Sequence, residues 1–322
     1  MIWFAWRRAR AQITIVAAAV LAVAAVAFAV GRADSTLRLW LSVLVVVLPG
    51  LLGAFWGAPL VAGELESGSY RLAWTQDVSR IRWLMLRLAL SGLAAMAVAG
   101  LASWLVTWWA GPLDRADLNQ FGSFDARNIV AAGYAAFALA LGVLLGILLR
   151  RTVPAMAATL VVFTASRLAF RQLARPRLLP PVIRALALDP STTGYGSSGF
   201  LPLMPAPSLQ PAAPNLPNSW ITSIAIVNGK GDTLTSSELA GTCPDIGHGG
   251  GAASGSGHVR APQSVVSATH DCVARIAATY HEVVTYQPAD RYWPLQWCEL
   301  GISLAVALLL AAACAWRLRK IG

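Results

Sequence analysis

The chain has 322 residues, of which 57% are hydrophobic and only 12% are charged. Soluble domains usually have about a quarter of their residues charged, so a soluble globular protein is excluded. The formal net charge of +10 does not indicate nucleic-acid binding, because most basic residues lie beside long apolar runs, where they govern membrane topology. We therefore predict a polytopic α-helical membrane protein.

Six apolar stretches reach roughly the 20 residues that an α-helix needs to cross a bilayer. They cover residues 12–31, 39–62, 84–110, 129–149, 152–173 and 293–316. The first follows Arg7, Arg8 and Arg10, as the apolar core of a signal peptide would. Because this core is longer than that of a signal peptide and no A-x-A cleavage site follows, we interpret it as a membrane span.

Two of the spans have glycines that bear on helix packing. The second is expected to bend, because it contains the helix-disturbing residues Pro49, Gly50, Gly53, Gly57 and Pro59. The fourth contains Gly142 and Gly146, whose spacing permits close approach of another helix. Simple packing explains these residues nearly as well as a moving or cavity-lining helix does.

The densest short block of mixed charge and aromatic side chains, GELESGSYRLAWTQDVSRIRW, covers residues 63–83 between the second and third spans. An ordinary interfacial loop is the weaker interpretation, because glutamates gain nothing from an anionic lipid surface. Charged and aromatic side chains together are typical of protein docking surfaces. We predict a short cytoplasmic helix or elbow that couples to a soluble partner through Glu64, Glu66, Tyr70, Trp74, Arg80 and Arg82.

The region between the fifth and sixth spans differs from the spans in composition, with many Pro, Gly and Ser residues. Residues 221–234 indicate a strand, a turn at Asn228-Gly229 and a second strand, and residues 270–284 indicate a short amphipathic helix. We predict a small mixed α/β extracytoplasmic domain. The predicted divisions are spans one to five with the coupling segment (1–174), the domain (175–291), and span six with a cytoplasmic tail (292–322).

Cys243 and Cys272 lie in this domain, and a cysteine pair on the oxidising side of a membrane most often forms a disulfide. We therefore predict a Cys243–Cys272 disulfide. Four potential metal ligands lie near the pair in sequence: His248, His258, His270 and Asp271. Because their spacing fits no closed zinc pattern and the intervening Gly/Ser tract would hold ligands poorly, we expect a flexible disulfide loop rather than the alternative, a metal site.

The distribution of Lys and Arg predicts that both termini are cytoplasmic. Twelve basic residues then flank the spans on the inner side: Arg7, Arg8, Arg10, Arg71, Arg80, Arg82, Arg87, Arg150, Arg151, Arg317, Arg319 and Lys320. Four fall in short outer loops: Arg32, Arg38, Arg115 and Arg127. Basic residues near or beyond the outer end of span five conflict with this orientation (Arg167, Arg171, Arg175, Arg177 and Arg184), but long translocated segments largely escape the charge rule.

Arg167 and Glu299 lie inside the fifth and sixth spans, near their outer ends. Charged side chains at that depth usually face the protein interior and find partners. We expect Arg167 and Glu299 to pair with each other, or each to pair with an equivalent polar group nearby. For Arg167, snorkelling to the headgroups is an equal alternative.

Catalytic and nucleotide-binding signatures are missing from the sequence: it contains no G-x-x-x-x-G-K-[ST], H-E-x-x-H or G-x-S-x-G motif. Any nucleotide chemistry therefore belongs to another chain. We predict no enzyme activity and no directly bound cofactor.

Residues 63–88, GELESGSYRLAWTQDVSRIRWLMLRL, resemble the cytoplasmic coupling-helix region of type-2 ATP-binding-cassette (ABC) permeases, especially actinobacterial ones. FDARNIVAAGYAAFALALGVLLGILLRRTVPAMAATL and YQPADRYWPLQWCELGISLAVALLL are similar to further parts of that family. The resemblance implies six spans per subunit, a dimer of membrane subunits, and two ATPase chains that bind ATP and Mg²⁺ and dock on the coupling helices. The large domain after span five departs from the simplest members.

The sequence thus favours the permease subunit of an ABC exporter in a bacterial plasma membrane, which moves an apolar or amphipathic substrate outward. The expected partners are the ATPase subunit, a second copy in a homodimer and membrane lipids. The alternative is a membrane sensor or scaffold whose extracytoplasmic domain binds a ligand. An intramembrane enzyme is disfavoured, because no catalytic constellation is present.

Overall fold

A computed structural model describes residues 35–67, 80–117, 121–189, 193–198, 206–211, 216, 218–244 and 263–321. The chain divides into two compact units: a helical unit, Met1–Leu179 with Asp290–Gly322, and an α/β unit, Pro180–Ala289. The first boundary falls after Leu179, not after residue 174 as predicted, because the helix of the fifth span continues to Leu178. Arg175 therefore belongs to the helical unit.

Among the described residues, five helical stretches are long and apolar enough to cross a membrane: Trp40–Glu64, Ile81–Trp108, Val130–Leu149, Thr152–Leu178 and Ala289–Lys320. They correspond to predicted spans two to six, and the predicted first span, 12–31, lies outside the described residues. Their main elements are α2 (Ser35–Leu52), α3 (Ala58–Ser67), α5 (Arg80–Asp117), α6 (Val130–Leu149), α7 (Thr152–Ala169), α8 (Arg175–Leu178) and α11 (Tyr292–Ile321). Three short helices, η1 (Gly53–Gly57), η2 (Phe121–Ala126) and η3 (Phe170–Ala174), interrupt or connect them, and η5 (Ala289–Arg291) precedes α11.

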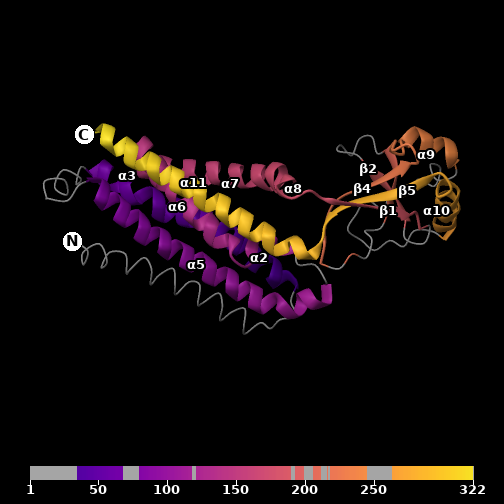
Figure 1. Ribbon diagram of the computed structural model, residues 1–322, viewed down its shortest axis with the longest axis horizontal. Helices are drawn as coiled ribbons and strands as arrows, with labels where there is room; N and C mark the ends of the chain where they lie inside the picture. Colours follow the sequence, from indigo (N-terminus) through magenta and orange to yellow (C-terminus); the bar gives the residue numbers. More distant parts are fainter. Residues whose placement is uncertain are drawn as a thin grey trace. The chain divides into compact units, whose positions relative to one another are not determined.

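Helix α6 is the centre of the helical unit and contacts α2, α3, α5, α7 and α11 (Figure 1). Its position follows from its composition, because it is uniformly apolar and most of its residues are buried. A helix that is apolar all round is expected inside a bundle rather than on its surface. The core of the unit includes Leu52, Trp56, Leu84, Leu139 and Ile147.

Glycines allow α6 to approach the second span until the two backbones touch. A Cβ atom built on Gly142 would lie 2.2 Å from the carbonyl oxygen of Gly53, and one built on Gly146 would lie 2.6 Å from that of Ala58. The second span departs from α-helical geometry at this contact, where η1 forms a π-helical turn between α2 and α3. Small residues at a membrane-helix interface permit such close packing.

The α/β unit contains a three-stranded antiparallel sheet in the order β1-β5-β4 and a separate antiparallel pair, β2-β3. The strands are β1 (Val182–Ala187), β2 (Thr193–Ser198), β3 (Ala206–Pro211), β4 (Trp220–Asn228) and β5 (Tyr280–Gln287), with helices α9 (Ser236–Thr242) and α10 (Gln263–Ile276). The first and last strands are neighbours, with Val182 opposite Tyr286. The chain therefore enters and leaves this unit on adjacent strands.

The predicted strand, turn and strand at residues 221–234 is only partly correct. Strand β4 ends at Asn228, and the returning segment makes a single bridge, Val227 to Thr233, before α9 begins. The Oδ1 atom of Asn228 accepts hydrogen bonds from the backbone N–H groups of Lys230 and Asp232, both at 2.9 Å. This side-chain turn uses five residues, so little chain remains for a second strand before the capping box of α9.

Cys243 and Cys272 form a disulfide with their Cα atoms 5.6 Å apart. It joins the residue that follows α9 to the middle of α10. Both cysteines are buried with Leu239, Val273 and Ile276 in the core of the α/β unit. The predicted amphipathic helix over residues 270–284 is α10, although its last third is strand β5 instead.

Glu282 is a buried acid in the central strand of this unit. It lies opposite Leu186 of β1 and Ile226 of β4, its residue is 6% exposed, and its Oε1 atom has no hydrogen-bond partner among the described residues. Burial raises the pKa of its carboxyl group. The Glu282 carboxyl group therefore binds a proton more readily in the folded than in the unfolded protein. The stability that this provides is fully present below the ordinary glutamate pKa and is lost as pH rises through the raised pKa of the folded protein.

We expect the E282Q variant to be more stable than the wild-type protein at about pH 8 and nearly equal to it at about pH 4. Amide hydrogen exchange of β5 peptides, compared between variant and wild type at each pH, measures this difference. E238Q is a control of opposite sign: Thr235 hydrogen bonds lower the pKa of Glu238, so loss of its charge should destabilise the protein at pH 8, and this effect should fade as pH falls through the lowered native pKa. A pH-independent effect of E282Q would contradict the prediction.

Candidate functional site

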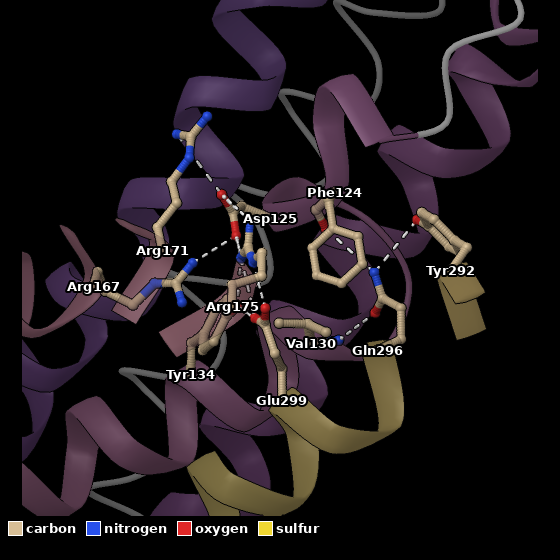
Figure 2. A network of polar contacts seen from close by, with 10 residues as sticks. All are labelled: Phe124, Asp125, Val130, Tyr134, Arg167, Arg171, Arg175, Tyr292, Gln296 and Glu299. Carbon is tan, nitrogen blue, oxygen red and sulfur yellow. Dashed lines mark hydrogen bonds and ion pairs between the residues drawn. The ribbon is translucent and has the colours of Figure 1, made fainter. Parts of the chain in front are cut away.

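Charged and polar side chains from four elements meet at one end of the helical unit. We call Asp125, Tyr134, Arg167, Arg171, Arg175 and Glu299 the polar cluster (Figure 2). Asp125 comes from η2, Tyr134 from α6, the three arginines from the continuous helix α7–η3–α8, and Glu299 from α11. Residues four apart on a helix lie on the same side, which explains why all three arginines turn toward Asp125.

Arg175 connects the two carboxylates of the cluster. Its Nε atom donates to Glu299 Oε1, and its Nη2 atom donates to Glu299 Oε2 at 3.1 Å and to Asp125 Oδ1. Its Nη1 atom lies 3.5 Å from Asp125 Oδ2. The side chains of Arg175 and Glu299 are 6% and 0% exposed, so this ion pair is almost completely removed from solvent.

The other two arginines contact Asp125 in different ways. Arg167 donates from Nη2 to Asp125 Oδ1 at 2.8 Å, and its guanidinium lies over the ring of Tyr134, 3.3 Å from the centroid. Arg171 approaches Asp125 only to 3.9 Å, and its side chain is 64% exposed. Tyr134 completes the cluster by donating its hydroxyl hydrogen to Glu299.

Arg167 and Glu299, the two residues singled out from the sequence, both lie in the polar cluster but pair with different residues. Arg167 pairs with Asp125, and Glu299 pairs with Arg175. Of the two arrangements expected from the sequence, a direct pair or separate pairing of each residue with a polar group nearby, these contacts are of the second kind. The continuation of the fifth span through η3 places Arg175 closer to Glu299, and the loop before α6 supplies Asp125.

The loop that supplies Asp125 is held by side chains from α5 and α11. Ser103 donates to the carbonyl oxygens of Ala126 and Asn128, at 3.1 and 2.9 Å. Gln296 accepts from the N–H group of Val130 at 3.2 Å and donates to the carbonyl oxygen of Phe124 at 3.3 Å (Figure 2). Because unpaired backbone groups are costly at membrane depth, these bonds allow a segment that is not α-helical to lie inside the helical unit.

The buried charges of the cluster balance. Arg167 and Arg175 oppose Asp125 and Glu299, and the third arginine, Arg171, is exposed. Burial acts to raise the pKa of Asp125, but the charges and hydrogen bonds of Arg175 and Arg167 hold it below its ordinary value. The arrangement is chemically a saturated set of ion pairs that connects four elements, and it presents no activated nucleophile.

The described residues contain no group of three or more His, Cys, Asp or Glu side chains that would hold a metal ion. Of the potential ligands noted in the sequence, His270 and Asp271 are exposed on α10. His248 and His258 lie outside the described residues.

Of the residues predicted to couple to a partner, Glu64 and Glu66 lie at the end of α3, away from the polar cluster. Glu64, near the end of α3, forms an ion pair with Arg87 of α5, whose guanidinium lies 4.4 Å from the ring centroid of Trp83. Glu66 Oε2 accepts hydrogen bonds from the backbone N–H and the hydroxyl of Thr152, at 3.0 and 2.7 Å. These two bonds lower the pKa of Glu66.

The other predicted coupling residues lie after α3. Arg80 is the first residue of α5, and Arg82 is exposed on the same helix. Tyr70 and Trp74 lie outside the described residues. Sequence reasoning missed Arg87 and Thr152, which resemble an ordinary flanking arginine and an ordinary helix-start threonine.

Residues 29–175 match the family model described as ABC-2 membrane transporter related. The match begins before α2, includes the charged segment 63–83, and ends at Arg175 of the polar cluster. The α/β unit and α11 lie outside the matched range. A comparison with curated proteins finds no match.

Proposed function

We propose, from the premise that this chain belongs to the ABC-2 membrane transporter related family, that it is the permease subunit of an ABC exporter. ATP binding by a separate ATPase would act on the segment 63–83 and move the second and fifth spans. An apolar or amphipathic substrate would then pass outward or laterally. The family match carries this proposal, because the matched range contains that segment together with both spans.

The contacts of Glu64 and Glu66 support a coupling role for this segment. The segment begins at the end of α3, where these residues contact α5 and α7. A force applied to the end of α3 would therefore reach α5 and α7 directly. Tyr70, Trp74, Arg80 and Arg82 are the proposed docking residues, since they combine aromatic rings and positive charge on this segment.

Exposed apolar side chains on α7 and α11 support a partner within the membrane. They include Val153, Val161, Leu168, Leu308 and Leu309. In a membrane-spanning chain such surfaces face lipid, another helix or a transported apolar molecule. We therefore propose a homodimer with membrane lipid around it.

The remaining parts of the proposal follow from the chemistry of the chain. ATP and Mg²⁺ would be bound by the partner ATPase, since no phosphate-binding loop occurs in this sequence. The excess of basic residues beside the ends of spans two, three, four and six supports cytoplasmic termini, and the proposed membrane is the plasma membrane of a bacterium. The α/β unit would then lie outside the plasma membrane, where its disulfide is stable.

Purification of the tagged full chain from its native host in mild detergent tests the proposal. We expect an ATPase with a phosphate-binding loop to co-purify in stoichiometric amount. The variants W74A and R82E should lose it, because they remove an aromatic anchor and reverse a docking charge. R275E, which reverses an exposed charge on α10 of the α/β unit, is the matched control and should retain the ATPase.

Recovery of the chain without an ATPase from several detergents would overturn the exporter assignment. The sensor or scaffold interpretation would then direct attention to the α/β unit. Equal loss of the ATPase from R82E and R275E would show that charge reversal disturbs the protein generally, and would contradict docking at residues 63–83.

A further inference from the structure

Helix α7 receives its N-terminal cap from a distant part of the chain. The first N–H groups of a helix have no partner within the helix, and the N-cap residue of α7, Arg151, makes no side-chain cap hydrogen bond. Glu66 supplies one instead, through its bonds to the backbone and hydroxyl groups of Thr152. A carboxylate at a helix N-terminus is also favoured by the helix dipole.

The two glutamates of α3 connect to different helices because of their spacing. Residues two apart on a helix do not face the same direction. Glu64 accordingly reaches Arg87 of α5, while Glu66 reaches Thr152 of α7. The end of α3 is therefore joined by polar side chains to both α5 and α7.

Helix α7 is fixed at its two ends and packs lightly between them. Its buried residues are Ala155, Thr159 and Phe163, four residues apart on one side of the helix. Beyond this single stripe, the helix continues through η3 and α8 and ends in the arginines of the polar cluster. Displacement of Thr152 along or across the helix would thus be carried to Arg167 and Arg175.

We propose that Glu66 is a positioning residue that passes movement of the coupling segment to α7, and through α7 to the polar cluster. Glu64 performs the equivalent task for α5. Neither glutamate acts as a docking contact for the ATPase. This inference rests on the proposed exporter function, because it requires an ATPase that acts on the segment.

Hydrogen exchange of the complex between the full chain and its co-purified ATPase tests the inference. Deuterium uptake is compared without nucleotide and with ATP plus vanadate. In the wild-type complex we expect nucleotide to change uptake in peptides that cover residues 81–90 and 167–178. In E66A the change at 167–178 should be lost and the change at 81–90 should remain, while the ATPase still co-purifies.

Two variants serve as matched controls. E66Q removes the charge but keeps an oxygen that accepts from Thr152, so it should retain the nucleotide-dependent change at 167–178. E64A should show the reverse pattern of E66A, with loss of the change at 81–90 alone. Loss of a purely local cap would raise uptake at the start of α7 in both nucleotide states and would leave the difference at 167–178 intact.

Three results would overturn the inference. Retention of the wild-type change at 167–178 in E66A would exclude transmission through Glu66. Loss of the ATPase from both E66A and E66Q would show that the Glu66 charge docks the partner. A wild-type chain that binds no ATPase would overturn the proposed function itself, and so would a wild-type complex without any nucleotide response. Either failure is seen in the wild-type protein, so it is distinguishable from a failure of the inference about Glu66.

Discussion

Replacing Arg175 with methionine is expected to lower the free energy of unfolding of the helical unit by about 3–5 kcal/mol, the usual cost of removing one partner from a buried ion pair. Arg175 is the shared partner of Asp125 and Glu299. In R175M the carboxylate of Glu299 loses its guanidinium partner while its side chain stays 0% exposed. Denaturant unfolding of the purified full chain in mild detergent measures the loss.

Arg171 provides the matched control for this prediction. It contacts the same Asp125 carboxylate, but only at 3.9 Å and with a side chain that is 64% exposed. We expect R171M to change the free energy of unfolding by less than about 1 kcal/mol, as is typical of exposed ion pairs. Equal effects of R171M and R175M would contradict the view that burial decides the energetics of the cluster.

A second substitution separates the cost of an unpaired charge from the cost of lost packing. In R175M/E299Q the buried negative charge is removed together with its partner, and Asp125 keeps Arg167. We expect the double variant to be less destabilised than R175M alone, because replacing both members of a buried pair is far less costly than removing one. The double-mutant cycle gives the coupling energy directly.

Much of the helical unit was predictable, because a membrane span is recorded in the sequence as a long apolar run. The residues at which the apolar runs end predicted the ends of the helices less well. The fifth span was expected to end near residue 173, since Arg175, Pro176 and Arg177 follow. The π-helical turn η3 continues the helix past that point, and no periodicity in the sequence indicates it.

The candidate sites likewise combine residues that were recognisable in the sequence with partners that were not. Arg167 and Glu299 were noticeable because a charge inside an apolar run is rare, and Glu64 and Glu66 because they belong to the dense charged block after the second span. Their partners were not, because Asp125 and Arg175 look like ordinary loop residues. The bonds that join these groups span 42 and 124 residues of sequence, and only the packing of α6 against α7 and α11 brings them together.

The closest backbone approach at any of the described glycines is at Gly142, and it leads to the second large effect. We expect Gly142→Ala to lower the free energy of unfolding by about 3 kcal/mol or more, at the upper end of the range for overpacking. The new Cβ atom would lie 2.2 Å from the carbonyl oxygen of Gly53 and 2.9 Å from the backbone nitrogen of Ala58. Neither is a flexible side-chain atom, so α6 and the second span must separate along their contact.

Gly301→Ala is the matched control, because Gly301 lies in the membrane-spanning helix α11 and a Cβ atom there meets nothing within 4 Å. Alanine is favoured over glycine within a helix by up to about 1 kcal/mol, so G301A should be neutral or slightly stabilising. Thermal unfolding in the same detergent compares the two variants. Equal unfolding temperatures of G142A and G301A would contradict the prediction, because α6 and the π-helical turn η1 would then have separated without losing other contacts. The contact between the second span and α6 would then contribute less to the stability of the helical unit than its geometry indicates.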